Sequence, residues 1–375
     1  MKNKYSSVEI RKLDCNYNIV IGRRSNGKTY DALYNALREY WESGCKTQFA
    51  VLRRWDEDFT KQRGASMFNS LICNGDGDNV IEDITGGEWN SVYYYSRRWF
   101  LAKFDMDLNK RVTMEEPFAF AFALSQMEHD KSTSYPNVKT IIFDEFISRD
   151  TYLRDEFVLF INTVSTIARE RTDVKIWLLG NTVNQYCPYF EEMGLNRVRT
   201  QKQGTIDVYT IGETDGNHIR IAVEYCKDSE RKNKSEKGDV NLFAFDNSRL
   251  KMVTNGAWEM LVYPHCPVPY TSKEIVFNFF VEFKSDVLHC EVIKHDDLLF
   301  IFVHKKTTPF KDITRDLIYT TEYNPRPNYR RRLTTPSTEL ERKIYNLFLI
   351  DKVFYADNVT GEIMRNYLLW CKSSN

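Results

Sequence analysis

Residues Gly22 to Thr29 have the types and the spacing of a phosphate-binding loop. They read GRRSNGKT, which fits the Walker A pattern G-x-x-x-x-G-K-[ST]. The two glycines let the backbone turn its N–H groups toward phosphates, and a following helix adds its positive dipole end. Lys28 is expected to reach the β- and γ-phosphates, and the Thr29 hydroxyl to coordinate Mg²⁺. The residues predicted to hold the nucleotide, ATP or GTP, are Gly22, Arg23, Arg24, Ser25, Asn26, Gly27, Lys28 and Thr29.

An acidic pair, Asp144 and Glu145, follows the apolar run at 140–143. After a buried strand this is a Walker B arrangement, in which Asp144 helps to hold Mg²⁺ and Glu145 polarises a water for attack on the γ-phosphate. By itself such a pair can be an ordinary surface feature. Together with the Walker A motif it predicts nucleotide hydrolysis with Mg²⁺.

Two further polar positions lie where a strand and a helix are expected to end. Asn181 follows an apolar run at 175–180, and ligands bind in open α/β sheets at such strand ends. It is predicted to bind the attacking water or the γ-phosphate, with a turn-forming Asn as the alternative. Arg169, with Arg171, ends the helical segment before that run. It is either a charge complementing a helix C-terminus or an arginine finger donated to a neighbouring subunit.

Strand and helix patterns alternate around these motifs. Apolar runs typical of buried strands lie at 18–21, 49–52, 140–143 and 175–179, and helical spacing at 30–42 and 157–167. The alternation predicts an α/β fold with a mostly parallel sheet and helices on both faces. The ATPase domain is expected to span 1–200, with an antiparallel insert at 75–128.

The sequence changes in character after residue 200. Residues 201–256 are predicted to form a linker subdomain with strands at 206–224 and a charged loop at 227–239. Residues 257–375 are rich in β-branched and aromatic residues and are predicted to form a second, α+β domain.

Whole-chain composition limits the class of protein. The 375 residues carry 52 Lys and Arg against 52 Asp and Glu, so any contact with nucleic acid must come from a local patch. The eight cysteines are scattered singly, which predicts free thiols in a reducing cytoplasm. No apolar signal-peptide core and no run of 18 apolar residues occur, so we expect neither secretion nor a membrane-spanning helix.

The most basic short stretch is 323–332, YNPRPNYRRR. Its arginines are predicted to bind the phosphates of nucleic acid or an acidic protein surface, with a solvated charged loop as the alternative. They are Arg326, Arg330, Arg331 and Arg332. Arg53 and Arg54, with Arg97 and Arg98, form a second candidate for nucleic-acid binding.

Five carboxylates in the second domain raise the question of nuclease activity. They are Asp286, Asp296, Asp297, Asp357 and Glu362. A two-metal nuclease needs its carboxylates clustered about 4 Å from a shared metal pair, and sequence spacing does not establish such clustering. Residue spacing alone therefore leaves nuclease activity open.

Several segments, taken in order, resemble one family. They are GRRSNGKTY, QFAVLRR, KSTSYPNVKTIIFDEFI, TIARERTDVKIWLLGN and PYF at 188–190. From residue 18 to about 190 the chain resembles the DNA-packaging (encapsidation) ATPases of the Bacillus phage phi-29 type, which are ASCE P-loop NTPases related to terminase large-subunit motors. Beyond residue 200 the similarity is loose and lies near 353–367.

The resemblance implies a homo-oligomeric ring, expected to have five subunits, at the portal vertex of a prohead in the host cytoplasm. Such a ring uses ATP hydrolysis to thread double-stranded DNA inward. Arg169 falls on the family's trans-acting arginine finger, Lys131 on a second basic position that acts between subunits, and Arg24 on the Walker A arginine. The C-terminal domain is implied to be RNase H-like, without nuclease carboxylates, and to bind nucleic acid or the portal complex.

Two departures from the family leave the docking partners open. They are the longer insert at 75–128 and the longer C-terminal domain, and they leave open whether a packaging RNA is used. The predicted function is an ATP-driven motor that moves double-stranded DNA into a prohead. The alternatives are a ring helicase or other DNA translocase, and a nucleotide-dependent assembly scaffold.

Overall fold

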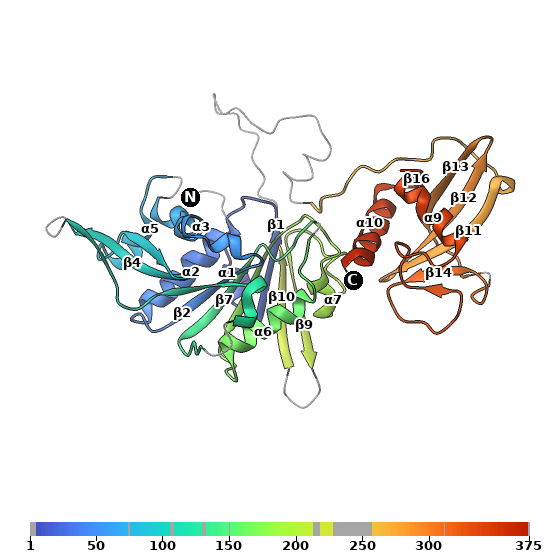
Figure 1. Ribbon diagram of the computed structural model, residues 1–375. Helices are drawn as coiled ribbons and strands as arrows, with labels where there is room; N and C mark the ends of the chain where they lie inside the picture. Colours follow the sequence, from blue (N-terminus) through green and yellow to red (C-terminus); the bar gives the residue numbers. More distant parts are fainter. Residues whose placement is uncertain are drawn as a thin grey trace, which may run out of the picture. The chain divides into compact units, whose positions relative to one another are not determined.

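The computed structural model describes residues 5–73, 76–105, 109–129, 133–149, 151–212, 218–227, 257–310 and 312–373. Contacts divide the chain into two units, Met1–Glu259 and Met260–Asn375. The first unit runs from blue to yellow in Figure 1 and the second from gold to red. No helix of the described residues is long and apolar enough to cross a membrane, and all eight cysteines are free.

The first unit is built on one large sheet whose six central strands are parallel. In spatial order they are β6 (Ala119–Ala123), β2 (Gln48–Arg53), β7 (Val138–Asp144), β8 (Lys175–Asn181), β1 (Tyr17–Gly22) and β10 (His218–Tyr225). These strands are short, nearly continuous apolar runs, as expected of parallel strands covered on both faces. The sheet confirms the predicted α/β class with a mostly parallel sheet.

Helices cover both faces of this sheet. They are α1 (Val8–Arg11), α2 (Lys28–Glu42), α3 (Lys61–Ser66), α4 (Asn69–Ile72), α5 (Val80–Thr85), α6 (Glu156–Ala168) and α7 (Pro188–Glu192), with 3-10 turns at Asp56–Phe59 and Leu124–His129. Successive side chains of a strand point to opposite faces. On β7, Ile141 and Phe143 accordingly pack with α6 and α7, whereas Ile142 packs with α2. Two separate cores therefore hold the sheet from either side.

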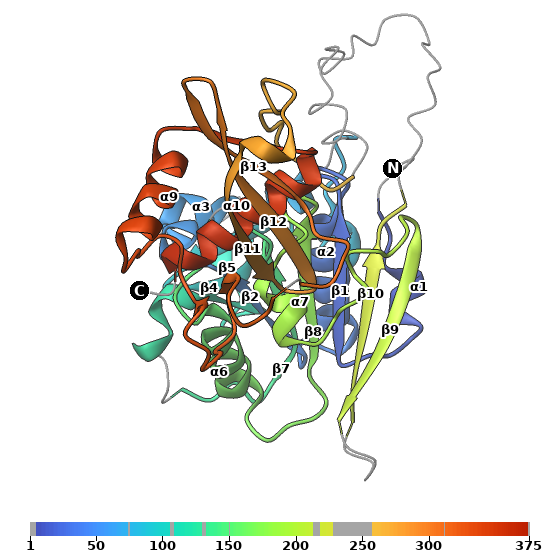
Figure 2. The ribbon, with the colours of Figure 1, turned by 90° about the vertical axis from the view of Figure 1, so that its right-hand side faces the viewer.

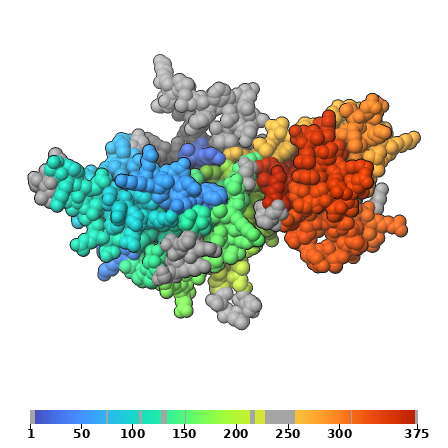
Figure 3. All heavy atoms as spheres, in the orientation of Figure 1, coloured from blue at the N-terminus to red at the C-terminus, as the bar shows by residue number. Residues whose placement is uncertain are grey.

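Antiparallel strands extend the sheet at both edges. They are β3 (Ser91–Tyr95), β4 (Arg98–Asp105) and β5 (Lys110–Thr113) at one edge and β9 (Thr205–Gly212) at the other. Figure 3 shows the extension made by β3 to β5, in teal, at the surface of the first unit. The sequence predicted residues 118–122 as part of an antiparallel insert, but β6 pairs in parallel with β2 and belongs to the central sheet.

The segment 201–256 differs from the predicted separate subdomain. Its described part contains β9 and β10, and β10 pairs in parallel with the Walker A strand β1 (Figure 2). The backbone N–H and C=O groups on the edge of β1 opposite β8 need hydrogen-bond partners, and β10 supplies them. The described strands of this segment are thus part of the first unit, while most of the predicted charged loop at 227–239 lies outside the described residues.

The second unit is an α+β arrangement with its own six-stranded sheet. Its strands, in spatial order, are β15 (Tyr329–Arg330), β14 (Leu317–Thr320), β11 (Ile275–Phe283), β12 (Asp286–His295), β13 (Leu298–Lys305) and β16 (Val353–Tyr355). Strands β11 to β13 form an antiparallel meander, and β14 and β16 pair in parallel at its two sides. Helix α10 (Asn358–Ser373) packs on the meander; α9 (Glu339–Leu349) and a 3-10 turn at Ser272–Glu274 complete the unit.

A buried ion pair lies between the sheet and α6. The guanidinium of Arg54 donates to both carboxylate oxygens of Glu156, at 2.7 and 2.8 Å, and both side chains are almost fully buried. Glu156 also accepts hydrogen bonds from the Leu153 N–H and the Tyr189 hydroxyl. Arg54 is therefore a structural residue, and its predicted contact with nucleic acid is wrong.

Replacing one partner of this pair should be costly, because the other charge is left buried without a counter-ion. We expect Glu156→Ala to lower the free energy of unfolding of the first unit by about 3–5 kcal/mol. The control is Glu9→Ala, which removes the exposed Lys12–Glu9 pair and should change stability by at most about 1 kcal/mol. Urea denaturation measures both; equal effects of the two variants would contradict the structural role of Glu156.

Candidate active site

The carboxyl ends of β1, β8 and β7 meet at one edge of the sheet. The register pairs Gly22 with Asn181, and Asp144 with Leu179, so the loop after β1 lies beside the ends of the other two strands. Strand β8 thus separates the Walker A strand from the strand that carries the acidic pair. Ligands of open α/β sheets bind at such carboxyl ends.

The loop between β1 and α2 requires glycine at two positions for different reasons. Gly27 is the N-terminal cap of α2 with φ +98°, a conformation that side chains rarely adopt. Gly22 lies in a crowded place, where a Cβ would approach Asn26 Nδ2 and Cys226 Cβ to 2.9 Å. The loop therefore leads directly into the N-terminus of α2, where the Lys28 N–H donates to Asn26 Oδ1 at 3.2 Å and the helix dipole favours an anion.

Lys28 is held inside this loop by four oxygen atoms. Its ammonium donates to the carbonyls of Gly22 (3.3 Å) and Arg23 (2.8 Å) and to the amide oxygens of Asn26 (3.0 Å) and Asn181 (3.2 Å). Burial lowers the pKa of Lys28 to about 8, because the charged form loses its hydration. The lysine is therefore a buried cation whose partners are mostly neutral oxygens.

Thr29 and Asp144 form the part of the site that fits a magnesium ion. The Thr29 hydroxyl donates to Asp144 Oδ1 at 3.0 Å, which joins the Walker A and Walker B segments directly. Asp144 is buried, and this burial raises the pKa of its carboxyl group. A hydroxyl and a carboxylate are hard oxygen donors, the type that Mg²⁺ prefers, so these two residues would hold the ion.

Arg53 binds both members of the acidic pair, which the sequence did not predict. Its guanidinium lies 2.6 Å from Asp144 Oδ2 and 2.6 Å from Glu145 Oε2. Glu145 has φ +61°, an uncommon backbone conformation for this residue type and one found often at functional sites. The prediction that Arg53 contacts nucleic acid is therefore wrong: it ends β2, next to β7, and the adjacency of these strand ends is the feature that places it here.

Cavities follow this edge of the sheet. One of about 310 Å³ is lined by Walker A residues together with Asp144, Glu145 and Asn181. A second of about 390 Å³ shares Arg24 and the acidic pair with it and is also lined by Arg53 and Arg149. A third, of about 670 Å³, shares Tyr30 with the first and extends along α2 past Tyr34. The site thus offers a polar phosphate-sized cavity beside a larger one with aromatic walls.

Arg169, the predicted arginine finger, lies away from these cavities. Arg169 follows α6 with φ +51°, and its exposed guanidinium donates to the Thr133 carbonyl at 3.2 Å. Among the described residues, it lines none of the three cavities. Arg171, by contrast, donates to the carbonyls of Tyr135, Pro136, Ile167 and Ala168 and holds the end of α6. Lys131 lies outside the described residues.

The basic stretch of the second unit is only partly available to a ligand. Arg330 pairs with the buried Glu341 at 2.9 Å, which joins β15 to α9. The Arg331 guanidinium lies over the Trp370 ring and donates to the Thr321 carbonyl, although the residue is exposed. Arg326 is exposed and Arg332 is half-buried. The structure therefore gives Arg330 a structural contact and leaves Arg326 and Arg331 facing solvent.

The five carboxylates considered for a nuclease do not gather. Among the described residues, none of them belongs to a group of three side chains with metal-ligand spacing. Asp286 pairs with Lys305, Asp357 accepts from the Thr360 N–H, and Glu362 accepts from the Leu261 N–H. Asp286, Asp357 and Glu362 therefore each have a local structural partner.

Comparison with known proteins gives the relationship of the chain. Residues 93–236 match the model of a family described as the Podovirus DNA encapsidation protein (Gp16). The DNA packaging proteins of Bacillus phages phi29 and B103 are 28% and 29% identical over 189 and 181 residues, which are 50% and 48% of this chain. The chain is homologous to the Bacillus phage DNA packaging proteins. It spans about half the length of these relatives, 48% in each case.

Solved structures with the same fold cover almost the whole chain. The Phi-29 viral genome packaging motor assembly contains a chain with a TM-score of 0.55 and 20% identity, covering 99% of this chain and 100% of its own. The Phi-28 gp11 DNA packaging motor gives a TM-score of 0.53 and 16% identity, with 99% of both chains covered. The resemblance to packaging ATPases inferred from the sequence motifs is thereby confirmed as homology, and the likeness of fold extends beyond the motifs to the second unit.

The pKa of Lys28 gives the site a defined pH dependence. Above about pH 8 the lysine of the unliganded site loses its proton, whereas bound phosphates would hold it charged. We expect the affinity for ADP to fall as the pH rises through 8, by up to about tenfold per pH unit. Calorimetric titrations at a series of pH values measure this.

The matched control is Lys28→Arg, whose guanidinium stays charged throughout this range. Its affinity, whatever its absolute value, should be nearly independent of pH. A wild-type affinity that does not change across this interval would mean that Lys28 is not the group that meets the phosphates.

Proposed function

We propose that this chain is the ATP-hydrolysing subunit of a motor that moves double-stranded DNA into a phage prohead. The observation that carries the proposal is the meeting of Lys28, the Thr29–Asp144 pair and Glu145 at one edge of the sheet. The homology to DNA packaging proteins supports the choice of translocation over other uses of ATP.

The residues divide the chemistry of hydrolysis among them. The Walker A backbone and Lys28 would bind the phosphates, and Thr29 with Asp144 would hold Mg²⁺, which supplies charge neutralisation on the β- and γ-phosphates. The larger cavity beyond Tyr30 has room for the nucleoside. Glu145 has an exposed carboxylate at the mouth of the phosphate cavity and would accept a proton from the attacking water. Asn181, bonded to Lys28, would orient that water or the γ-phosphate.

Glu145 must leave Arg53 before it can act as a base. Glu145 Oε2 lies 2.6 Å from the Arg53 guanidinium, so this oxygen would become available to a water only when the ion pair opens. The same arginine also holds Asp144, so an ion bound at Asp144 competes with Arg53 for that carboxylate. Binding of Mg²⁺ and nucleotide would therefore loosen Arg53 and release Glu145 toward the water.

A neighbouring copy of the chain would complete the site. Arg169 is exposed at the end of α6 and lines none of the described cavities of its own chain, as expected of a residue donated to another subunit. This arrangement requires a homo-oligomeric ring around the DNA, which we propose to be a pentamer docked on the portal vertex. Lys131 is proposed as a second cation between subunits, and Arg326, Arg331 and Arg332 as contacts to DNA, packaging RNA or the portal.

Removing the base should separate binding from hydrolysis. We expect Glu145→Gln to keep ATP affinity within a few-fold and to lower the turnover number by at least about 10²-fold. With purified proheads, DNA and ATP, the wild type should protect DNA from added nuclease and the variant should not. Normal hydrolysis by Glu145→Gln would remove Glu145 from this role.

The same assay distinguishes the proposed motor from its alternatives. Hydrolysis stimulated by single-stranded rather than double-stranded DNA would indicate a helicase. Turnover that DNA does not change, without protection of DNA, would indicate an assembly scaffold.

An arginine finger acts on the neighbour, so its loss is complemented in mixed rings. We expect Arg169→Ala to lower turnover by about 10³–10⁵-fold in homogeneous rings. Adding Arg169→Ala subunits to Glu145→Gln subunits should restore part of the activity, because some mixed interfaces join an intact base to an intact arginine. The exposed Arg154 gives the control: Arg154→Ala should hydrolyse ATP normally. No recovery on mixing would place Arg169 outside the role of a trans finger.

A further inference from the structure

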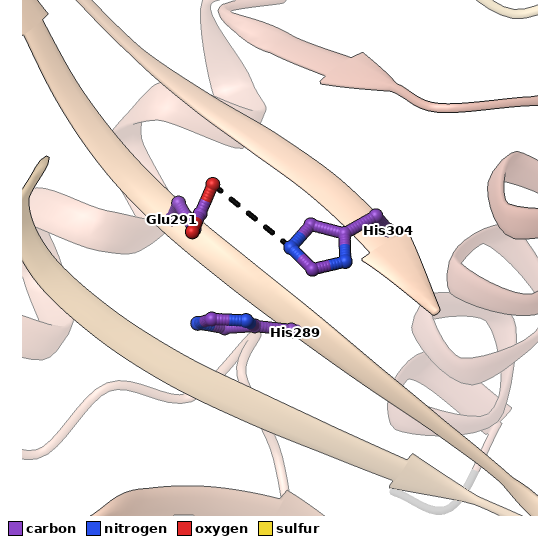
Figure 4. A group of neighbouring side chains, drawn as sticks. All are labelled: His289, Glu291 and His304. Carbon is purple, nitrogen blue, oxygen red and sulfur yellow. Dashed lines mark ion pairs between the residues drawn. The ribbon is translucent and has the colours of Figure 1, made fainter. Parts of the chain in front are cut away.

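Two histidines and a glutamate lie together on one face of the second unit's sheet (Figure 4). His289 and Glu291 are two residues apart on β12, so their side chains point to the same face. His304 on β13 is directly opposite His289 in the antiparallel register. The ladder thus fixes all three side chains on one small area of sheet, and none of them belongs to the proposed ATP site.

The distances within this group suit a shared ion better than direct hydrogen bonds. One ligand atom from each residue lies within 4.8 Å of the other two. Glu291 Oε2 and His304 Nε2 are 3.9 Å apart, beyond a normal hydrogen bond. Ligand atoms on a tetrahedral Zn²⁺ are about 3.4 Å apart, given bonds of 2.0–2.2 Å. Because the three side chains are only half-buried, small rotations about their χ angles would close the difference.

Each of the three side chains is oriented by a further group, as ligands of metal sites usually are. The Nδ1–H of His304 donates to the Lys305 carbonyl at 3.1 Å, which leaves the lone pair on Nε2, the nitrogen that faces Glu291. The His289 Nε2–H donates to the Asn278 amide oxygen at 2.9 Å, and the Tyr270 hydroxyl donates to Glu291. With these bonds made, Nε2 of His304 and Nδ1 of His289 are the nitrogens left to bind a metal.

Apolar rings border the group. Phe280 stacks on His289 with the ring centroids 4.8 Å apart, and Phe302 lies 5.8 Å from the His304 ring. Lys306, whose ammonium lies over Phe280, is the neighbouring cation. The explanation without a metal is a protonated His304 paired with Glu291, with the His289 ring packed edge-on against the His304 ring at a centroid distance of 4.8 Å.

We propose that His289, Glu291 and His304 bind one zinc-type divalent ion, with water in the remaining position. Two imidazoles and one carboxylate are a donor set for Zn²⁺ rather than for Mg²⁺ or Ca²⁺, which prefer oxygen. The single carboxylate also separates this site from a two-metal nuclease. The ion would tie β12 to β13 through side chains, independently of nucleotide chemistry in the first unit.

Cobalt(II) and zinc(II) test the proposal on the untagged, full-length protein without nucleotide. We expect one Co²⁺ per chain, with d–d absorption and no thiolate charge-transfer band, displaced by one equivalent of Zn²⁺. The affinity for Zn²⁺ should fall at least tenfold in each of three variants, His289→Gln, Glu291→Gln and His304→Gln. In Tyr270→Phe it should fall about tenfold. His295→Gln is the matched control, since His295 also lies on β12 and pairs with a glutamate, Glu274, yet should leave the affinity unchanged.

Circular dichroism of each metal-free variant shows whether the variant is folded. Among the wild type and the four histidine and glutamate variants, Zn²⁺ should raise the melting temperature only of the wild type and of His295→Gln. Three results would overturn the site. They are the absence of stoichiometric binding, a thiolate band that points to cysteine, and an equal loss of affinity in His295→Gln and His304→Gln.

Discussion

The active-site edge depends on keeping two opposite charges buried close together. Lys28 and Asp144 are each almost inaccessible, and burial by itself drives both toward their neutral forms. Carbonyl and amide oxygens hold the lysine, while Thr29 and Arg53 hold the aspartate. A phosphate would be a stronger partner for Lys28, and a magnesium ion would be a stronger partner for Asp144. The site is therefore prepared for a ligand that carries both charges, as Mg²⁺ with a nucleotide does.

Arg53 gives this edge a second property, because it joins the ion-binding carboxylate to the proposed base. Because one guanidinium pairs with both Asp144 and Glu145, a ligand that binds Asp144 would also change how firmly Arg53 holds Glu145. Glu145 itself has a left-handed backbone conformation and a largely exposed side chain. Such a coupling would prevent hydrolysis until nucleotide and metal are in place.

Much of the first unit followed from local patterns. The apolar runs predicted β1, β2, β7 and β8, and helical spacing at 30–42 and 157–167 predicted α2 and α6 nearly to their ends. The pairing of strands distant in sequence was not predictable: β6 was assigned to an antiparallel insert, and β10 to a separate segment. The pattern of apolar residues along a strand shows which of its faces is buried, but it does not show which other strand lies beside it in the sheet.

The sequence by itself determined the loop that we propose to bind a nucleotide, because Walker A spacing is a local constraint on one loop and the helix after it. The sequence also determined that the acidic pair lies at the end of a strand, because a short apolar run ends there. Only the tertiary structure decided where the arginines belong: Arg53 at the acidic pair, Arg54 in the core and Arg330 on Glu341. The physical reason is that a guanidinium is placed by its counter-ion, and the carboxylates that pair with Arg53 and Arg54 come from distant parts of the chain. The same holds for His289, Glu291 and His304, which only strand pairing brings together.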